Sequence, residues 1–141
     1  MEYEEYFFRY GLHDTVVKSV EVTDTGLEFF FPEGVYFLNE KGMETEKTPP
    51  CKMVITIRDF SPKKLWQHIE IQSVRKHVMK EIPCREFMRY VKKYGMEICL
   101  NYLTLFMSAI LLDAGIKSRG VYVRISEIES IHYIMQEDEN S

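Results

Sequence analysis

Two-residue alternation of apolar and polar positions runs through much of the chain. Residues 15–23 alternate, a turn at 24–26 follows, and residues 27–31 return with their odd-numbered apolar side chains on one face. Such alternation lines the two faces of a β-strand, so the pair predicts a hairpin. After a second turn at 32–34, the short apolar segment 35–38 predicts a strand that is buried on both faces or ends in the core.

The middle of the chain predicts a loop, two strands and a helix. Residues 39–50 are rich in charge, glycine and proline without an apolar period, which is typical of an exposed loop. Residues 52–58 and 65–78 alternate again and predict two more strands. Residues 84–94 predict the helix, because their apolar positions recur at helical spacing and Gly95 suits a left-handed stop.

The segment 96–115 fits either a buried helix or two strands. We favour the strands, because the polar turn at 117–119 then leads into a further alternating strand at 120–126 and continues a meander. Past a bulge at 126–127, residues 128–135 extend that strand. In this interpretation the inward residues of the first strand are Met96, Ile98, Leu100 and Tyr102.

These elements predict an α+β fold, a mostly antiparallel β sheet or two-layer sandwich of about seven or eight strands with one short packed helix. The length of 141 residues predicts a single globular domain over 1–141, with 1–9 and 136–141 as frayed ends. A composition that is 45% hydrophobic and 28% charged excludes a disordered or collagen-like chain.

Charge argues against direct binding of nucleic acid. The net charge is -4 and the isoelectric point is near 5.6, opposite to the basic footprint that phosphate backbones attract. Residues 58–93 are the exception, with ten Lys and Arg against four Asp and Glu. That local excess predicts a solvated basic face, with an anionic-ligand site as the alternative. The rest of the chain is acidic.

Cysteine spacing and hydropathy predict a cytoplasmic protein without metal, cofactor or membrane span. Cys51, Cys84 and Cys99 are an odd number without a C-x-x-C pair, as expected for reduced thiols. The first residues are acidic, where a secretory signal would be basic. The longest uncharged stretch, 98–112, has 15 residues and is too short for a membrane helix.

Residues that could bind a partner are acidic or aromatic. The sequence has no G-x-S-x-G, H-E-x-x-H or glycine-rich phosphate loop, so we expect no catalytic residues and no enzyme. Aromatic rings set among glutamates suit the rim of a protein interface, although they also suit an end strand packed on the sheet. The candidate binding residues are Tyr3, Tyr6, Phe7, Glu40, Glu44 and Glu46.

A second set of polar residues belongs to an alternative function. The chain has nine Tyr, nine Phe and one Trp, which fill a core or line the cavity of a closed barrel. In the barrel, His68, Glu70 and His132 would be the polar groups inside. Two His and one carboxylate also form metal sites, but ligands at i and i+2 of one strand stand about 7 Å apart, which does not favour chelation.

The opening of the chain resembles a family of small uncharacterised bacterial proteins. The similarity rests on the turn Leu12-His13-Asp14 and on the hairpin residues Val17, Val20, Leu27, Phe29, Phe31 and Gly34. Proteins of this kind are β-rich, and some are immunity proteins of polymorphic toxins. The resemblance implies a non-catalytic protein-binding domain, an antitoxin that neutralises a basic toxin or nuclease by stoichiometric binding. The alternative is a small-molecule-binding or enzymatic β-barrel with an aromatic-lined cavity.

Overall fold

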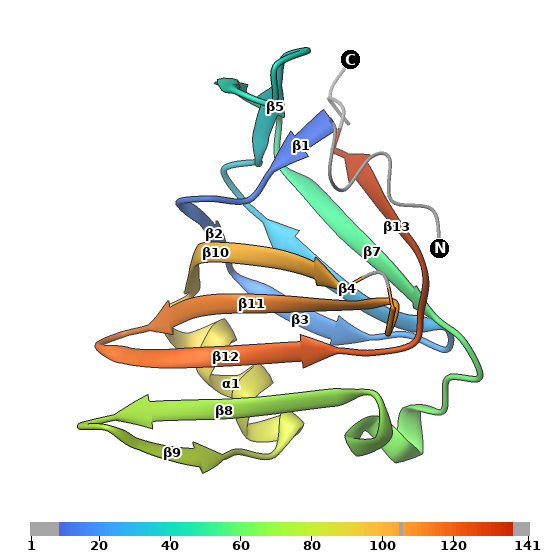
Figure 1. The fold of residues 1–141 in the computed structure, drawn as a ribbon, viewed down its shortest axis with the longest axis vertical. Helices are drawn as coiled ribbons and strands as arrows, with labels where there is room; N and C mark the ends of the chain where they lie inside the picture. The colour runs from blue at the N-terminus through green and yellow to red at the C-terminus, as the bar shows by residue number, and fades with distance from the viewer. Residues whose placement is uncertain (1–8, 105, 137–141) are drawn as a thin grey trace.

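The computed structural model describes residues 9–104 and 106–136, in which thirteen strands form three sheets beside one α-helix (Figure 1). All strand pairs are antiparallel. The predicted α+β class, mostly antiparallel with one short helix, is confirmed. Of the ends predicted to fray, 1–9 and 136–141, all but Arg9 and Gln136 lie outside the described residues.

The largest sheet has six strands. Their order across the sheet is β2 (Thr15–Val17), β10 (Met96–Thr104), β11 (Ala109–Ile116), β12 (Arg119–Ile125), β8 (Ile69–Arg75) and β9 (Val78–Glu81). A short 3-10 helix, η2 (Pro62–Gln67), precedes β8. The strands β10, β11 and β12 follow one another in sequence and in space, as the predicted meander requires.

A four-stranded sheet faces the large one, and a small third sheet adjoins it (Figure 1). The four-stranded sheet has the order β13 (Ile128–Met135), β7 (Cys51–Ile57), β4 (Gly26–Phe31) and β3 (Ser19–Val22). The third sheet consists of β1 (Tyr10–Gly11), β5 (Tyr36–Leu38) and β6 (Glu44–Lys47).

The chain passes between the two main sheets three times, once through the segment 58–68 that contains η2 and twice at tight corners. At Lys18 it leaves β2 for β3, and the Lys18 N–H donates to the Phe30 carbonyl at 2.9 Å. At Ser126 and Glu127 it leaves β12 for β13, with Glu127 at φ 56°. The segments predicted as single strands, 15–23 and 120–135, are therefore each divided between two sheets.

The core lies between the inner faces of the two main sheets. It is lined by aromatic and aliphatic side chains that are almost wholly buried, among them Phe29, Met53, Ile71, Leu112 and Val123. Burial of these alternating apolar positions is the main source of folding free energy. The apolar period in the sequence thus marks the inner faces.

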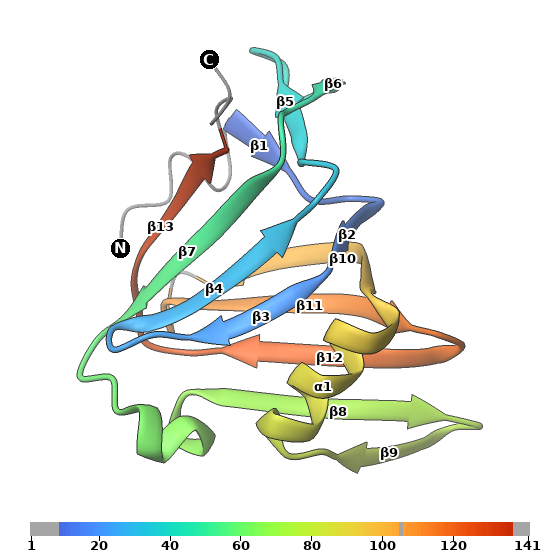
Figure 2. The same cartoon turned by 180° about the vertical axis from the view of Figure 1, so that it is seen from behind.

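The helix α1 (Cys84–Tyr94) covers the part of the large sheet that the four-stranded sheet does not reach. Figure 2 shows it crossing β12 and β8 beside β3. Phe87 and Val91, one turn apart, are buried against the core. Gly95 ends the helix at φ 77°, a conformation that costs glycine little, which confirms the predicted stop.

The two strands favoured for 96–115 are confirmed, but their facing was partly wrong. Met96 and Ile98 are buried as predicted, whereas Leu100 is 46% exposed and Tyr102 51% exposed. The register shifts between Ile98 and Leu100, because Ile98 pairs with Ala114 and Leu100 with Asp113. Cys99 is therefore an extra residue, a β-bulge, and every later side chain of β10 changes face.

Short strands account for the difference from the predicted strand count. The predicted loop 39–50 contains the exposed strand β6, and the predicted strand 65–78 divides into η2 and β8. β9 follows β8 through Lys76 and His77, at φ 50° and 66°. A two-residue hairpin turn with both φ values positive usually contains Asn or Gly, so the pair Lys76 and His77 does not predict this turn.

Candidate protein-binding face

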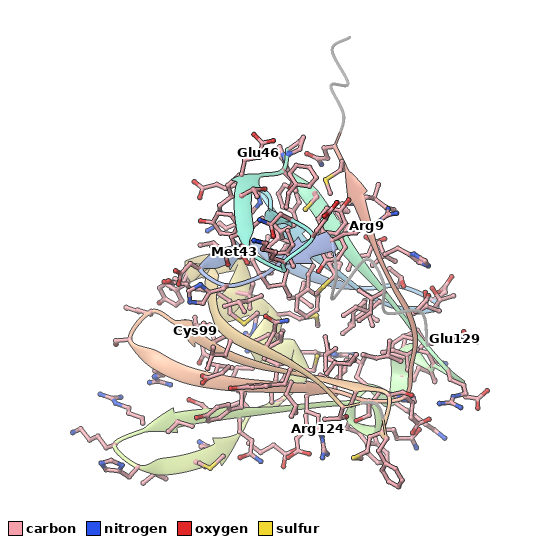
Figure 3. The ribbon with its side chains drawn as sticks, turned by 45° about the horizontal axis from the view of Figure 1, so that its top comes forward. Arg9, Met43, Glu46, Cys99, Arg124 and Glu129 are labelled. Atoms are coloured by element: carbon pink, nitrogen blue, oxygen red, sulfur yellow. The ribbon has the colours of Figure 1, made fainter. Side chains whose placement is uncertain are left out.

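Of the residues predicted to bind a partner, the structure describes only the three glutamates. Tyr3, Tyr6 and Phe7 lie outside the described residues. Glu40, Glu44 and Glu46 are exposed on β6 and the turn before it, with the Glu44 carboxylate 3.7 Å from His13 Nδ1. Figure 3 places Glu46 on the small sheet, well away from Arg124 on the large one.

The residues of the alternative function lie in three separate places. His68 is buried, Glu70 stands on the outward side of the six-stranded sheet, and His132 is exposed on β13. The core that would have to be hollow is filled by side chains such as Phe29 and Phe31. Within residues 9–104 and 106–136, no group of three or more His, Cys, Asp or Glu could hold a metal ion.

His68 is the unusual member of that set. Its ring lies 5.6 Å from the ring of Phe60, and its exposed fraction is only 5%. Neither ring nitrogen has a hydrogen-bond partner among the described residues. An unpaired buried polar group costs free energy, so His68 weakens the fold where its ring nitrogens have no partner.

The outward side of the six-stranded sheet carries the clearest candidate surface, which we call the outer face. Odd-numbered residues of β11 and even-numbered residues of β12 point there, and the bulge at Cys99 adds even-numbered residues of β10. A shallow depression of about 420 Å³ lies on this side of the sheet. The outer face consists of Glu70, Gln72, Met79, Leu100, Tyr102, Leu111, Asp113, Tyr122 and Arg124.

Cross-strand pairing arranges these side chains in rows. One row runs across four strands, where Tyr102 pairs with Leu111, Leu111 with Arg124, and Arg124 with Glu70. Directly opposed residues on one face have Cβ atoms about 5 Å apart, so the row forms a continuous surface. A second row joins Leu100 to Asp113 and then to Tyr122.

A polar network fixes one end of the outer face. Arg124 Nη2 donates to Glu70 Oε2 in an ion pair, and Gln72 Nε2 donates to Glu70 Oε1 at 2.8 Å. Both partners of the ion pair are partly exposed, so solvent screens it and its contribution to stability is small. Its effect is to hold the Arg124 guanidinium in place beside the apolar residues.

The other end of the outer face is acidic. Desolvation raises the pKa of the Cys99 thiol, and the negative charges of Asp113, Glu97 and Asp14 raise that pKa further. These three carboxylates, which we call the acidic border, therefore act together on one point of β10. Figure 3 shows Cys99 on the same sheet as Arg124.

The outer face has the composition of a protein interface. Tyrosine, methionine and arginine are enriched in such surfaces, and amphipathic rings contact a partner with little loss of side-chain entropy. Alternation continued from Met96 places Leu100 and Tyr102 in the core, so this face was not predicted from the sequence. The one signal was the loss of alternation after Ile98, where Cys99 and Leu100 are both of apolar type.

The chain matches no protein-family model, no curated protein and no solved structure. Among the residues that the structure describes, none belongs to a helix long and apolar enough to cross a membrane. The geometry of the site is that of an open sheet surface with a shallow depression, lined by apolar, polar and charged side chains. Such a surface suits a protein partner better than a small substrate, which needs enclosure.

Proposed function

We propose that this chain is a non-catalytic protein-binding domain that binds its partner through the outer face. The observation that carries the proposal is the exposure of Leu100, Tyr102 and Tyr122 on one side of the sheet, with β11 between the first two and the third. The turn between β10 and β11 adds Phe106, whose side chain is fully exposed. Clustered exposed apolar side chains rimmed by polar ones are typical of interaction sites.

The charge of the outer face favours a basic partner. Asp113, Glu97 and Asp14 border the apolar residues, while Arg124 is neutralised by Glu70. Complementary charge steers association and excludes partners of the wrong sign. The same border repels a phosphate backbone, so the proposal includes no direct contact with nucleic acid.

The biological role follows from the resemblance and not from the face itself. Because the opening of the chain resembles immunity proteins of polymorphic toxins, we propose a bacterial antitoxin that works in the cytoplasm. Its partner would be a toxin with a basic surface, such as a nuclease, held in a stoichiometric complex. The separation of His68, Glu70 and His132 lends no support to the alternative of an enzymatic or ligand-binding barrel.

The proposed partner is sought in the product of the gene next to this one. A toxin and its antitoxin are made together, so the product of the neighbouring open reading frame is coexpressed with this chain and the complex is measured by calorimetry. We expect Tyr102→Ala to weaken the complex at least about tenfold, as at central interface tyrosines, with little change in thermal unfolding. Leu100→Ala has a matched control in Ile134→Ala, an equally exposed aliphatic residue on β13.

Two results would count against the proposal, and they differ in meaning. A stoichiometric complex that binds equally well with Tyr102→Ala and with Leu100→Ala would exclude the outer face as the interface. Absence of any complex with the neighbouring gene product, together with a stable monomer, would exclude the antitoxin role.

A further inference from the structure

A second cleft lies on the other side of the six-stranded sheet, between α1 and the ends of β8, β9 and β12. Its volume is about 470 Å³, within the range of small-molecule sites. Figure 2 shows the helix crossing this side of the sheet, so the cleft and the outer face are separated by the thickness of the sheet. What binds in one does not touch the other.

The cleft has an apolar floor and a tyrosine-bearing wall. Val121 on β12 pairs with Ser73 on β8, and Ile116 at the end of β11 adjoins them. Tyr90 and Tyr94, four residues apart on α1, line the helical side. A stripe with this spacing lies on one face of a helix, so both rings border the same space.

Cations from distant parts of the sequence meet around this cleft. Lys80 comes from β9, Lys117 from the turn after β11, and Arg119 from the start of β12. Lys117 Nζ lies 4.7 Å from the centroid of the Tyr94 ring, and Lys93 Nζ lies 5.2 Å from the same centroid. Like charges repel one another, so such a cluster favours a ligand that neutralises it.

The acidic residues of the cleft do not cancel this charge. The lining includes Glu81 and Glu86, and Glu86 Oε1 accepts a hydrogen bond from the Tyr90 hydroxyl at 2.8 Å. Tyr90 and Tyr94 lie near charges of opposite sign. The hydrogen bond to Glu86 raises the pKa of Tyr90, whereas a hydrogen bond from Lys93 and the charge of Lys117 lower the pKa of Tyr94. Lys93 and Lys117 thus gather at the Tyr94 ring, whereas the charge of Arg119 acts on Tyr90.

We propose that this cleft binds a small organic anion, with its apolar body between Tyr90 and Val121 and its carboxylate or phosphate group held by Lys117 and Arg119. Of the basic segment 58–93, which the sequence left open between a solvated face and an anionic-ligand site, Lys80 lines the cleft, whereas Lys117 and Arg119 come from outside that segment. The proposal does not depend on the protein-binding role of the outer face.

The test is a titration of the whole chain followed by its backbone amide resonances. The probes are phenyl phosphate, benzoate, inorganic phosphate and uncharged benzyl alcohol. We expect saturable shifts at Ser73, Tyr90 and Val121 with phenyl phosphate or benzoate, with affinity of roughly 0.1 to 5 mM for ligands of this size. Whichever of the two binds more tightly identifies the head group as phosphate or carboxylate.

Variants separate this site from general attraction of anions. Lys117 and Arg119 are exposed, so Lys117→Gln with Arg119→Gln leaves the core intact and is checked by thermal unfolding. We expect the double variant to weaken binding at least about fivefold, because charged hydrogen bonds are lost. Lys41→Gln, at an exposed lysine on the β5–β6 turn, is the matched control and should change binding less than about twofold.

Several outcomes would overturn the proposal. One is the lack of saturable shifts with either ring anion at about 20 mM, well above the expected dissociation constants. Another is equal binding by the double variant and the wild type. If benzyl alcohol binds as tightly as the ring anions, charge does not contribute to binding. If inorganic phosphate binds as tightly as phenyl phosphate, the apolar body does not contribute.

Discussion

The inner and outer faces of the six-stranded sheet differ in chemistry although the same strands build both. On β11, Leu112 points inward and is 1% exposed, whereas its neighbour Leu111 lies on the outer face. On β12, Val123 is buried between Tyr122 and Arg124, which are both exposed. Adjacent residues thus serve separate purposes, so substitutions one position apart can separate stability from binding.

Single-residue deletions test this comparison most severely. Because Cys99 is the extra residue of a bulge, its deletion leaves the pairs Ile98–Ala114 and Leu100–Asp113 and keeps every later side chain on its face. Deletion of Tyr122 from the regular strand β12 reverses the facing of the residues that follow. We expect deletion of Cys99 to lower the free energy of unfolding by less than about 2 kcal/mol. Deletion of Tyr122 should lower it by about 4 kcal/mol or more.

Urea unfolding followed by circular dichroism measures both deletions. If the two chains unfold at the same urea concentration, the bulge does not determine the facing of β10. If the Cys99 deletion alone fails to fold, the bulge is needed for folding itself and not only for the facing of Leu100 and Tyr102.

The pair Leu111 and Leu112 gives the same comparison with one kind of substitution. Leu112→Ala leaves a cavity in the core and should cost about 2 to 4 kcal/mol of unfolding free energy. Leu111→Ala removes part of an open surface and should cost less than about 1 kcal/mol. Partner binding is expected to respond in the opposite order, with Leu111→Ala weakening the complex. Equal losses of stability at the two positions would contradict the assignment of faces.

The sequence predicted the strands well and their assembly less well. Period-two alternation identified β4, β7 and β12, because each has one buried side, whereas β11 was predicted from the meander that it continues. It did not identify β9, whose four residues are all exposed and whose pairing depends on a turn without glycine. Nor did it show that the chain changes sheet at Lys18 and Glu127. The buried positions change phase there, from Val17 to Val20 and from Ile125 to Ile128.

The candidate surface was not predictable for a related reason. A pattern of apolar residues shows which side chains share a face but does not tell whether that face is covered. The bulge at Cys99 arises from pairing with β11, a partner that lies beyond the local sequence. The convergence of Lys80, Lys117 and Arg119 likewise needs the hairpins in place, although the basic excess around residues 58–93 was visible.

Two buried polar residues, Thr15 and His68, differ in their hydrogen bonding within the largely apolar interior. Thr15 is fully buried, and its hydroxyl donates to the Leu12 carbonyl at 2.6 Å. His68 is buried too, but its ring nitrogens lack hydrogen-bond partners in the described part of the chain. Removing an unpaired buried polar group recovers its desolvation cost, so His68→Leu should stabilise the fold by about 1 kcal/mol.

Thermal unfolding checks this prediction. For a chain of this size, about 1 kcal/mol corresponds to a midpoint increase of roughly 2 to 5 °C. His77→Leu, at an exposed position in the β8–β9 turn, is the control and should leave the midpoint nearly unchanged. A lower midpoint for His68→Leu would show that the imidazole has a structural partner in solution.

The smallest expected effect concerns the acidic border, where Cys99 serves as a built-in probe. Only the thiolate reacts with a disulfide reagent, and nearby carboxylates disfavour the thiolate. Asp113→Asn removes one of these charges, so the pKa of Cys99 should fall and its labelling at pH 8 should become about twofold faster. Burial raises the pKa of Cys84 to about 11, which keeps that thiol protonated at pH 8.

The comparison variant is Glu129→Gln, an exposed carboxylate on β13 that is not among the charges acting on Cys99. It should leave the labelling rate unchanged, and high salt should reduce the effect of Asp113→Asn because exposed charges are screened. Identical rates for Asp113→Asn, Glu97→Gln and the wild type would mean that these carboxylates do not act on β10 as a group. The outer face would then have no acidic border, and the argument for a basic partner would lose its physical basis.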